Sequence, residues 1–465
     1  MKKKNLIRLC AYIAGMSLLA GTFTACGDKT VDYVVDGETA NSSSDDETLA
    51  LKYGIPEQCE KTLDTGDSGL TEISINDAEV TYPSTSGMDI VYYTKSDIAN
   101  EKKQEIAENI FDTSEGIYEI DLENRTKSDI QQDIDYYEKM VQIYTENGMS
   151  DMAEEYQADL NSYNEAMENA PDEYQAAGDY SGSYYMGSID GRKYTLNFSS
   201  DGIYFDPWDI DYKSRDDLEN VAGYVYGSSE YISSDEINEL TNLCSYTESE
   251  AQSIAEDFMV DVGIDDMILT ETNELCWEYN NLITSQSELT ELDGYVFTFA
   301  RAVSNSPVAT KSLSNVDNLT TEDGYVDIYA EECKIAVDSN GILYAWWTVY
   351  MKATGKTEEN AELLSFDAML EIANESVADY YTEYPTSYSE IEFNNVELSY
   401  YLSETEEDGI FKYVPAWIFT EYEEDDEYSN ANYPNQMVVI DATDGSVIDL
   451  TSLSKALGMY YEYGE

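Results

Sequence analysis

The sequence predicts an α+β protein whose helices and antiparallel strands come in separate runs along the chain. Apolar residues recur at helical spacing in several segments, and alternating segments are joined by tight Asp-Gly turns. Hydrophobic residues make up 42% of the 465 residues, which is enough for real cores despite the strong charge. In chain order we expect a lipid-anchored tether, a helical hairpin plus a β-meander, and two units of one helix on an antiparallel sheet.

Residues 1–25 are typical of a secretory signal peptide, with a basic start followed by an apolar stretch over 9–20. A membrane-spanning helix needs about 20 apolar residues, and this run is shorter and interrupted by glycines. Ordinary signal peptidase cleavage after Ala25 is disfavoured because bulky Phe23 would stand at the third position before the cut. Phe23-Thr24-Ala25-Cys26 instead resembles the lipobox of bacterial lipoproteins, although Phe23 replaces the usual leucine.

The resemblance implies that Cys26 is the site of lipid attachment, where a diacylglycerol with palmitate-type chains joins the sulfur. Each buried methylene contributes about 0.8 kcal/mol, so two or three chains make release from the membrane negligible. Residues 26–71 are polar and acidic, and this composition predicts a flexible tether. We therefore expect an extracellular lipoprotein on the outer face of the cytoplasmic membrane of a Gram-positive cell.

The chain is a strong polyanion, with 24 Lys and Arg against 96 Asp and Glu and a net charge of −72. Removal of residues 1–25 takes away four basic and no acidic residues, which leaves a net charge of −76. Such a field repels nucleic acid and anionic lipid, and nucleic-acid binding is excluded on this ground. We interpret the charge as a solvating surface that keeps a monomer soluble, with a specific cation site as the alternative.

Four cysteines remain once the signal and the lipid site are set aside: Cys59, Cys244, Cys276 and Cys333. They allow three complete disulfide pairings, between which the sequence does not choose, and their spacing matches no zinc motif.

Residues 72–235 are expected to form an α+β domain. Two strands and a helix over 98–111 come first, followed by a helical hairpin over 128–170 and a β-meander over 180–210. In the hairpin, Ser128 with Gln131 forms a capping box, and Ser150 caps the second helix. Its apolar stripes indicate a packing seam rather than a surface for a partner helix. The meander turns at Asp190-Gly191.

Residues 236–355 and 356–465 carry a loose internal repeat. Each begins with an amphipathic helix, the first opened by a capping box from Thr247 to Glu250, and each continues as strands around an Asp/Gly turn. At "TESEAQSIAEDF", "YVPAWIFTEY" and "VVIDATDGSVIDL" the chain resembles the PepSY-like modules of Gram-positive surface proteins. The whole layout is similar to a family of uncharacterised clostridial-type surface lipoproteins. These resemblances imply a location and a fold, and they imply no activity.

The chain has no histidine, which removes histidine-dependent nucleophilic catalysis and the zinc sites of metalloproteases. Ser452-Leu453-Ser454-Lys455 fits the S-x-x-K pattern, but no S-D-N or K-T-G partner motif accompanies it, so it is interpreted as a chance match. Asp206, Asp209 and Asp211 are a weak calcium candidate without EF-hand spacing. We therefore expect no catalytic residues, metal or cofactor.

The adjacent Trp346 and Trp347 place one indole on each face of a strand. One ring belongs to the core; the other is either partly exposed core or a stacking surface for sugar or peptide. The leading hypothesis is a non-enzymatic surface protein that binds or regulates a protein or peptide. The alternative is a carboxylate-based hydrolase or a glycan-binding lipoprotein that acts on surface polysaccharide.

Overall fold

The computed structural model describes residues 48–95, 97–120, 125–199, 202–208, 222–229, 237, 240–264, 266–281, 286–310, 324–326, 331–422 and 434–462. These residues form an α+β structure, mostly sheet, with seven helices in the described part of the chain. Its strands make two large sheets and one two-stranded sheet of β13 (Gly324–Val326) and β20 (Tyr460–Glu462).

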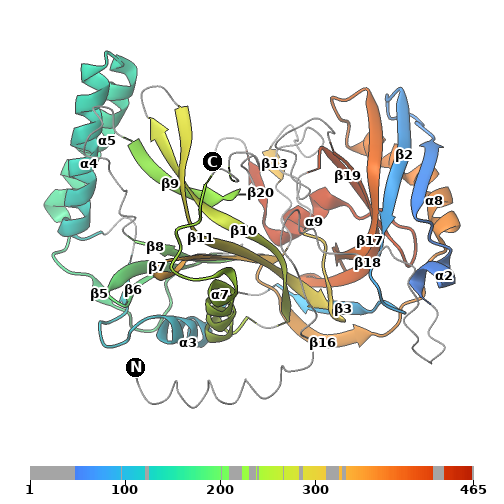
Figure 1. Cartoon of the computed structure of the whole chain (residues 1–465), viewed down its shortest axis with the longest axis horizontal. Coiled ribbons are helices and arrows are strands. Elements are labelled where there is room, and N and C mark those ends of the chain that lie inside the picture. The colour runs from blue at the N-terminus through green and yellow to red at the C-terminus, as the bar shows by residue number, and fades with distance from the viewer. Residues whose placement is uncertain are drawn as a thin grey trace. The chain divides into compact units, whose positions relative to one another are not determined.

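The seven-stranded sheet combines strands from both ends of the described chain (Figure 1). Its order is β1-β2-β17-β18-β3-β16, with β19 also paired to β18; β2 and β17 are parallel and the other pairs are antiparallel. The strands are β1 (Gln58–Leu63), β2 (Glu72–Thr81), β3 (Ile90–Thr94), β16 (Lys352–Glu358), β17 (Glu390–Glu404), β18 (Ile410–Glu421) and β19 (Gln436–Asp441). The helices α2 (Leu49–Tyr53), α8 (Phe366–Glu383) and α9 (Leu450–Leu457) add buried residues to its core.

The predicted tether is wrong for residues 48–71, because these residues form α2 and β1. Leu49 and Tyr53 lie on one helical turn, and Cys59 and Leu63 lie along the strand; all four are buried. The segment is polar overall because it lies at the edge of the sheet, where its remaining side chains face solvent. Residues 1–47, including Cys26, lie outside the described residues. Within the described part, no helix is long and apolar enough to cross a membrane.

The eleven-stranded sheet holds most of the middle of the chain. Its order is β5-β4-β6-β7-β8-β15-β14-β11-β10-β9, with β12 also paired to β11, and every pair is antiparallel. The strands are β4 (Tyr118–Glu119), β5 (Gln175–Ala176), β6 (Tyr184–Ile189), β7 (Arg192–Phe198), β8 (Gly202–Pro207), β9 (Ala222–Ser228), β10 (Met267–Asn281), β11 (Gln286–Val303), β12 (Ser306–Pro307), β14 (Glu332–Asp338) and β15 (Gly341–Thr348).

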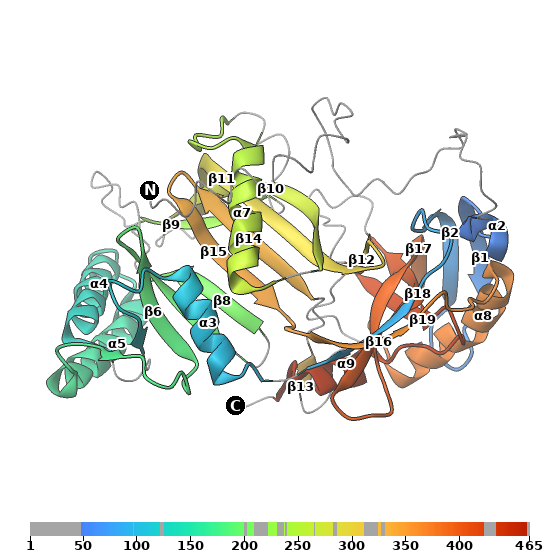
Figure 2. The same cartoon turned by 90° about the horizontal axis from the view of Figure 1, so that it is seen from below.

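One face of this sheet is covered by α3 (Asn100–Ile110) and α7 (Glu248–Val262). Figure 2 shows both helices lying across the strands, and their buried residues share one core cluster with the sheet. The predicted capping box at the start of α7 is present: Thr247 accepts from the Glu250 backbone N–H, and the Glu250 side chain accepts from the Thr247 backbone N–H. The core cluster therefore lies on the α3 and α7 side of the sheet.

The helical hairpin consists of α4 (Lys127–Glu146) and α5 (Ser150–Asn169), and its apolar stripes pack against each other as a seam. Both predicted N-caps are corrected. Thr126 caps α4 through a bond from the Asp129 N–H, and Met149 precedes α5 without a side-chain cap, so Ser150 is the first helical residue. The N-cap is the last residue with extended backbone angles before the helix. The spacing of apolar residues in the sequence predicts the position of this residue only to within about two residues.

The segments after Thr247 and Ser365 each open with a capped helix followed by antiparallel strands in the same order. After α7 come the hairpin β10–β11 and then β14 on β11; after α8 come β17–β18 and then β19 on β18. Phe366 at the start of α8 packs on Trp417 of β18 with ring centroids 5.0 Å apart. Residues 72–235, predicted as one domain, instead supply β2 and β3 to one large sheet and β4 to β9 to the other.

A buried ion pair beside the eleven-stranded sheet contacts two tyrosines of the seven-stranded sheet. Arg301 on β11 contacts Glu331 with two bonds, Nε to Oε2 at 3.0 Å and Nη2 to Oε1 at 2.5 Å. The Tyr413 hydroxyl of β18 donates to Glu331 Oε2 at 3.3 Å, and the Arg301 guanidinium lies 5.4 Å from the ring centroid of Tyr93 on β3. Burial lowers the pKa of Arg301, but Glu331, Tyr413 and Tyr93 together raise it overall, so Arg301 stays charged. Burial raises the pKa of Glu331, and the attraction and hydrogen bonds of Arg301 oppose that rise.

Candidate functional site

A row of polar and aromatic side chains crosses six strands of the eleven-stranded sheet. Direct strand pairing connects each residue with the next, and directly paired residues point to the same face. We call these residues the polar row: Asn197 on β7, Tyr204 on β8, Trp346 on β15, Lys334 on β14, Thr298 on β11 and Glu271 on β10. Strands lie about 4.8 Å apart, so five steps extend over about 24 Å.

The polar row lies on the face opposite α3 and α7. Side chains alternate between the two faces of a strand. On β7, β8, β15, β14 and β11, both sequence neighbours of the row residue belong to the core cluster under those helices: Leu196, Phe198, Ile203, Phe205, Ala345, Trp347, Cys333, Ile335, Phe297 and Phe299. The strands therefore place the apolar residues under the helices and the row on the other face.

Three buried polar atoms on the row's face have no hydrogen-bond partner. They are the Thr298 hydroxyl, Asn197 Oδ1 and Asn273 Nδ2, the last on β10 opposite Val296. Thr298 is only 2% exposed. An unpaired buried polar group costs about 1–3 kcal/mol, and proteins rarely leave such groups unsatisfied. Ordered water or a bound molecule would complete the hydrogen bonds of these three atoms.

Trp346 is a fixed aromatic surface within the row. Its indole Nε1 donates to Asp206 Oδ1 at 2.8 Å, and its ring stacks on Tyr344 with centroids 4.3 Å apart and planes 22° apart. Asp206 lies on the same face, since it is two residues from Tyr204 along β8. Burial raises the pKa of the Asp206 carboxyl, and the bond from Trp346 lowers it in part. The indole is thus held in one orientation, and it remains half-buried rather than fully covered.

Apolar side chains flank the row on the same face. Tyr344, Trp277 and Val296 belong to a small buried cluster against which Trp346 packs. The ammonium group of Lys334 in the row pairs with Glu332 at 3.7 Å. The face therefore offers an aromatic patch beside a line of hydrogen-bonding groups, with its lysine charge balanced by a carboxylate.

The expectation for the two adjacent tryptophans is confirmed in its geometry. Trp347 is 5% exposed and belongs to the core under the helices, whereas Trp346 lies on the opposite face. Of the calcium candidates, Asp206 bonds to Trp346, and Asp209 and Asp211 lie outside the described residues. No group of potential metal ligands occurs among the residues that the structure describes.

The serine of the S-x-x-K match has a structural role, and the four cysteines form no disulfide bonds. Ser452 of the S-x-x-K match donates its hydroxyl to Asp449, the N-cap of α9, at 2.7 Å. Cys59, Cys244, Cys276 and Cys333 are free thiols. Burial raises the pKa of the Cys276 thiol to about 12, and the nearby Glu274 and Glu278 carboxylates act in the same direction. Because the thiolate is the reactive form, this cysteine is chemically inert at neutral pH.

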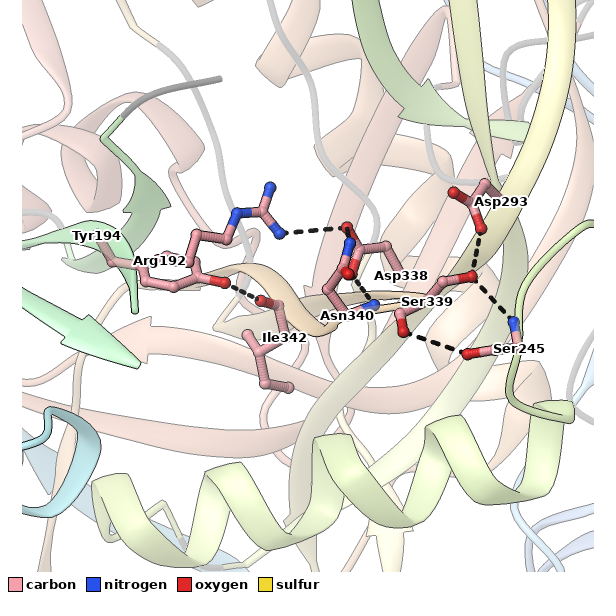
Figure 3. Close-up of polar contacts among 8 residues, drawn as sticks. All are labelled: Arg192, Tyr194, Ser245, Asp293, Asp338, Ser339, Asn340 and Ile342. Atoms are coloured by element: carbon pink, nitrogen blue, oxygen red, sulfur yellow. Dashed lines mark hydrogen bonds and ion pairs between the residues drawn. The ribbon is translucent and has the colours of Figure 1, made fainter. Parts of the chain in front are cut away.

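A second polar cluster surrounds the turn between β14 and β15, and its contacts fix the turn (Figure 3). Asp338 accepts from the Asn340 N–H at 2.7 Å and pairs with Arg192 at 3.2 Å, while Ser339 bonds both Ser245 and Asp293. The turn after β19 has a similar arrangement: Asp441 accepts from the Thr443 N–H at 2.8 Å and pairs with Lys412 at 3.5 Å. Because its groups satisfy one another, we interpret this cluster as a structural clamp.

Sequence reasoning missed Asn197, Asn273, Thr298 and Lys334 as site residues. The available signal was local alternation, since Thr298 stands between two phenylalanines in "FTF" and Asn197 between Leu and Phe in "LNF". Such alternation shows that a polar residue faces away from the core, but only the pairing of six strands places these residues in one line.

Comparison with known proteins identifies no family. No protein-family model matches the chain, and no curated protein does. A solved structure of an uncharacterized protein from Eubacterium rectale ATCC 33656 is 13% identical, with 87% of this chain and 96% of that chain covered and a TM-score of 0.38. The function is therefore argued from the chain's own residues.

Proposed function

We propose that this chain is a non-enzymatic binding protein, anchored by lipid on Cys26 to the extracellular face of the cytoplasmic membrane, that holds its ligand on the polar row. The signal-like start and the lipobox resemblance at Phe23 to Cys26 support the location. In this proposal the segments 236–355 and 356–465 are PepSY-like units. The first of them supplies four of the six strands of the row, β10, β11, β14 and β15.

The observation that carries the proposal is the buried, unpartnered Thr298 hydroxyl, accompanied on the same face by Asn197 Oδ1 and Asn273 Nδ2. Buried polar groups of this kind are completed by ordered water or by a bound molecule, and the proposal is that a bound molecule completes these. The fixed Trp346 ring lowers the cost of ordering the site when a ligand binds.

Binding is preferred to hydrolysis because the carboxylates beside Trp346 are already engaged. Asp206 holds the indole N–H, and Glu332 pairs with Lys334. A glycosidase needs two carboxyl groups free to act on opposite sides of one bond. Of the two classes that the sequence leaves open, the row therefore supports a binding protein over a carboxylate hydrolase.

Radical footprinting of Trp346 on intact cells that make the protein tests this proposal. We expect Trp346 to be less oxidised on cells than in the purified full chain, because the ligand covers it. Tyr388, which is 43% exposed and lies outside the row, is the control and should be oxidised equally in both. Equal oxidation of Trp346 in the two samples would contradict the proposal.

A further inference from the structure

We propose that the hairpin of α4 and α5 is a docking surface for a basic amphipathic helix of another protein. The hairpin contributes no residue to the polar row, so this inference goes beyond the proposed function and stands apart from it. It is carried by the half-covered apolar stripe of α5, by a row of tyrosine rings and by the charge of the two helices.

The apolar stripe of α5 is only half covered. The helix has 20 residues and fully buries only Ala153 and Leu160, whereas α8, with 18 residues, buries seven. The core clusters of the hairpin contain only residues within 130–170, and in them four large side chains of α5 are partly buried: Met152, Tyr156, Tyr163 and Met167. Helices in proteins gain most of their stability by packing such a stripe against other elements. The stripe of α5 therefore has apolar area left for a further helix.

Five tyrosines form a continuous line of ring contacts across the two helices, which we call the tyrosine row. They are Tyr136, Tyr137 and Tyr144 of α4 and Tyr156 and Tyr163 of α5. The ring centroid of Tyr137 lies 5.4 Å from that of Tyr136, 5.6 Å from that of Tyr156 and 5.1 Å from that of Tyr163. The centroids of Tyr144 and Tyr156 are 5.1 Å apart, and Tyr136 is 43% exposed. Tyrosine and methionine, the residue types of this stripe and row, are enriched at protein interfaces.

The hairpin is strongly acidic. Residues 127–169 contain eleven Asp and Glu against two Lys, a net charge of −9. Glu155 and Asp159 stand one turn apart on the exposed side of α5, and neither pairs with a basic residue in the part of the chain that the structure describes. Like charges one helical turn apart repel each other, and a cation between them removes that cost.

These two carboxylates act on the tyrosine row. Burial, then Tyr163 and Asp159, raise the pKa of Tyr137 to about 12. Burial, then Tyr156 and Glu155, raise the pKa of Tyr144. The carboxylates therefore lie beside the rings, where a Lys or Arg side chain reaches an acidic group and the face of a tyrosine together.

The apolar area and the charge together specify the occupant. The apolar face of a basic amphipathic helix packs on the stripe of α5, and its Lys and Arg side chains lie beside Glu155 and Asp159, as in other cases where a helix binds in a groove. A second copy of this chain fits poorly, because each copy carries a net charge of −72 and the two repel each other.

The test measures binding of two synthetic peptides to the purified full chain by calorimetry in a zwitterionic detergent, with titration into detergent alone subtracted. The leucine peptide has three repeats of Lys-Leu-Ala-Lys-Lys-Leu-Ala and is about as long as α5 when helical, roughly 30 Å. The glutamine peptide replaces each Leu by Gln, so it keeps the charge and loses the apolar stripe. At about 0.15 M salt we expect the leucine peptide to bind about tenfold more tightly or better.

Matched variants place the binding on the hairpin. Glu155→Gln with Asp159→Asn should weaken binding of the leucine peptide by about threefold or more, and Tyr136→Ala should weaken it by about threefold. The control for the first is Glu371→Gln with Glu375→Gln, an exposed acidic pair one turn apart on α8. The control for the second is Tyr388→Ala, since Tyr388 is also 43% exposed. Both controls should leave binding unchanged, and all the substituted side chains are exposed, so the variants should fold normally.

Three outcomes would overturn the inference. The first is that the leucine peptide does not bind. The second is that the glutamine peptide binds as tightly, which would show attraction to charge alone. The third is that the α8 pair weakens binding as much as the α5 pair, which would assign binding to the field of the whole chain. None of these outcomes bears on the polar row, so the proposed function stands or fails separately.

Discussion

Removal of Arg301 should destabilise the folded chain more than any surface change does. Arg301→Met keeps much of the side-chain volume but leaves Glu331, whose side chain is 0% exposed, without its cation. At a charge separation of about 4 Å and an effective dielectric of about 20, the lost attraction is about 4 kcal/mol. Measured losses on breaking buried pairs are about 3–5 kcal/mol, which agrees.

Urea unfolding followed by tryptophan fluorescence measures this loss, and a double-mutant cycle isolates it. We expect Arg301→Met and Glu331→Leu each to lower the free energy of unfolding by about 3 kcal/mol or more. Arg301→Met with Glu331→Leu removes both charges and should lose clearly less than the two single changes together. A loss below about 1 kcal/mol for Arg301→Met, or strict additivity in the cycle, would refute the view that this pair is a buried, coupled contact.

Three further predictions follow from the charges and the anchor. Burial raises the pKa of the carboxyl groups of Asp133, Asp206, Glu274, Glu331 and Glu404, so between pH 5 and pH 8 these groups bind more protons in the folded chain than in the unfolded chain. The protonated form of these carboxyl groups contributes fully to stability below their ordinary pKa values, 3.8 for Asp and 4.5 for Glu, and this contribution is lost as the pH rises through the raised values. Melting temperatures should therefore rise when the pH is lowered from 8 to 5. A fall in melting temperature would contradict this prediction. Sodium chloride should raise the melting temperature as the Debye length falls from about 30 Å to about 8 Å, and calcium at matched ionic strength should add nothing that saturates; a saturable, calcium-selective rise would reveal a metal site. Cys26→Ser should abolish membrane retention and labelling by a clickable fatty acid, and a variant that is still labelled and pelleted with membranes would rule out Cys26 as the anchor.

Local structure was predictable from the sequence where neighbouring residues decide it. The capping box from Thr247 to Glu250 depends on four consecutive residues, and the turn at Asp190-Gly191 depends on the left-handed backbone that both residues adopt. The two faces of the strand around Trp346 and Trp347 follow from simple alternation. In each of these cases the interaction lies within a few residues of the chain.

The sheet partners were not predictable in the same way. β2 pairs in parallel with β17, which lies more than 300 residues later in the chain. The sequence of neither strand indicates which strand it pairs with. The same limit applies to the polar row, whose members come from β7 to β15 and meet only when six strands align. Residues 48–71 look like a tether in composition because an edge strand with one solvated face contains few apolar residues.

The most direct measurement of the central claim compares Thr298→Val with the parent chain in two assays at once. If the Thr298 hydroxyl is kept for a ligand, the variant should be as stable as the parent or more stable by about 1 kcal/mol, since an unpaired buried hydroxyl is removed. In the same variant, Trp346 on intact cells should lose its protection from radical oxidation. A variant that is destabilised by more than about 1 kcal/mol while Trp346 stays protected would contradict the account, because the hydroxyl would then serve the fold and not the ligand.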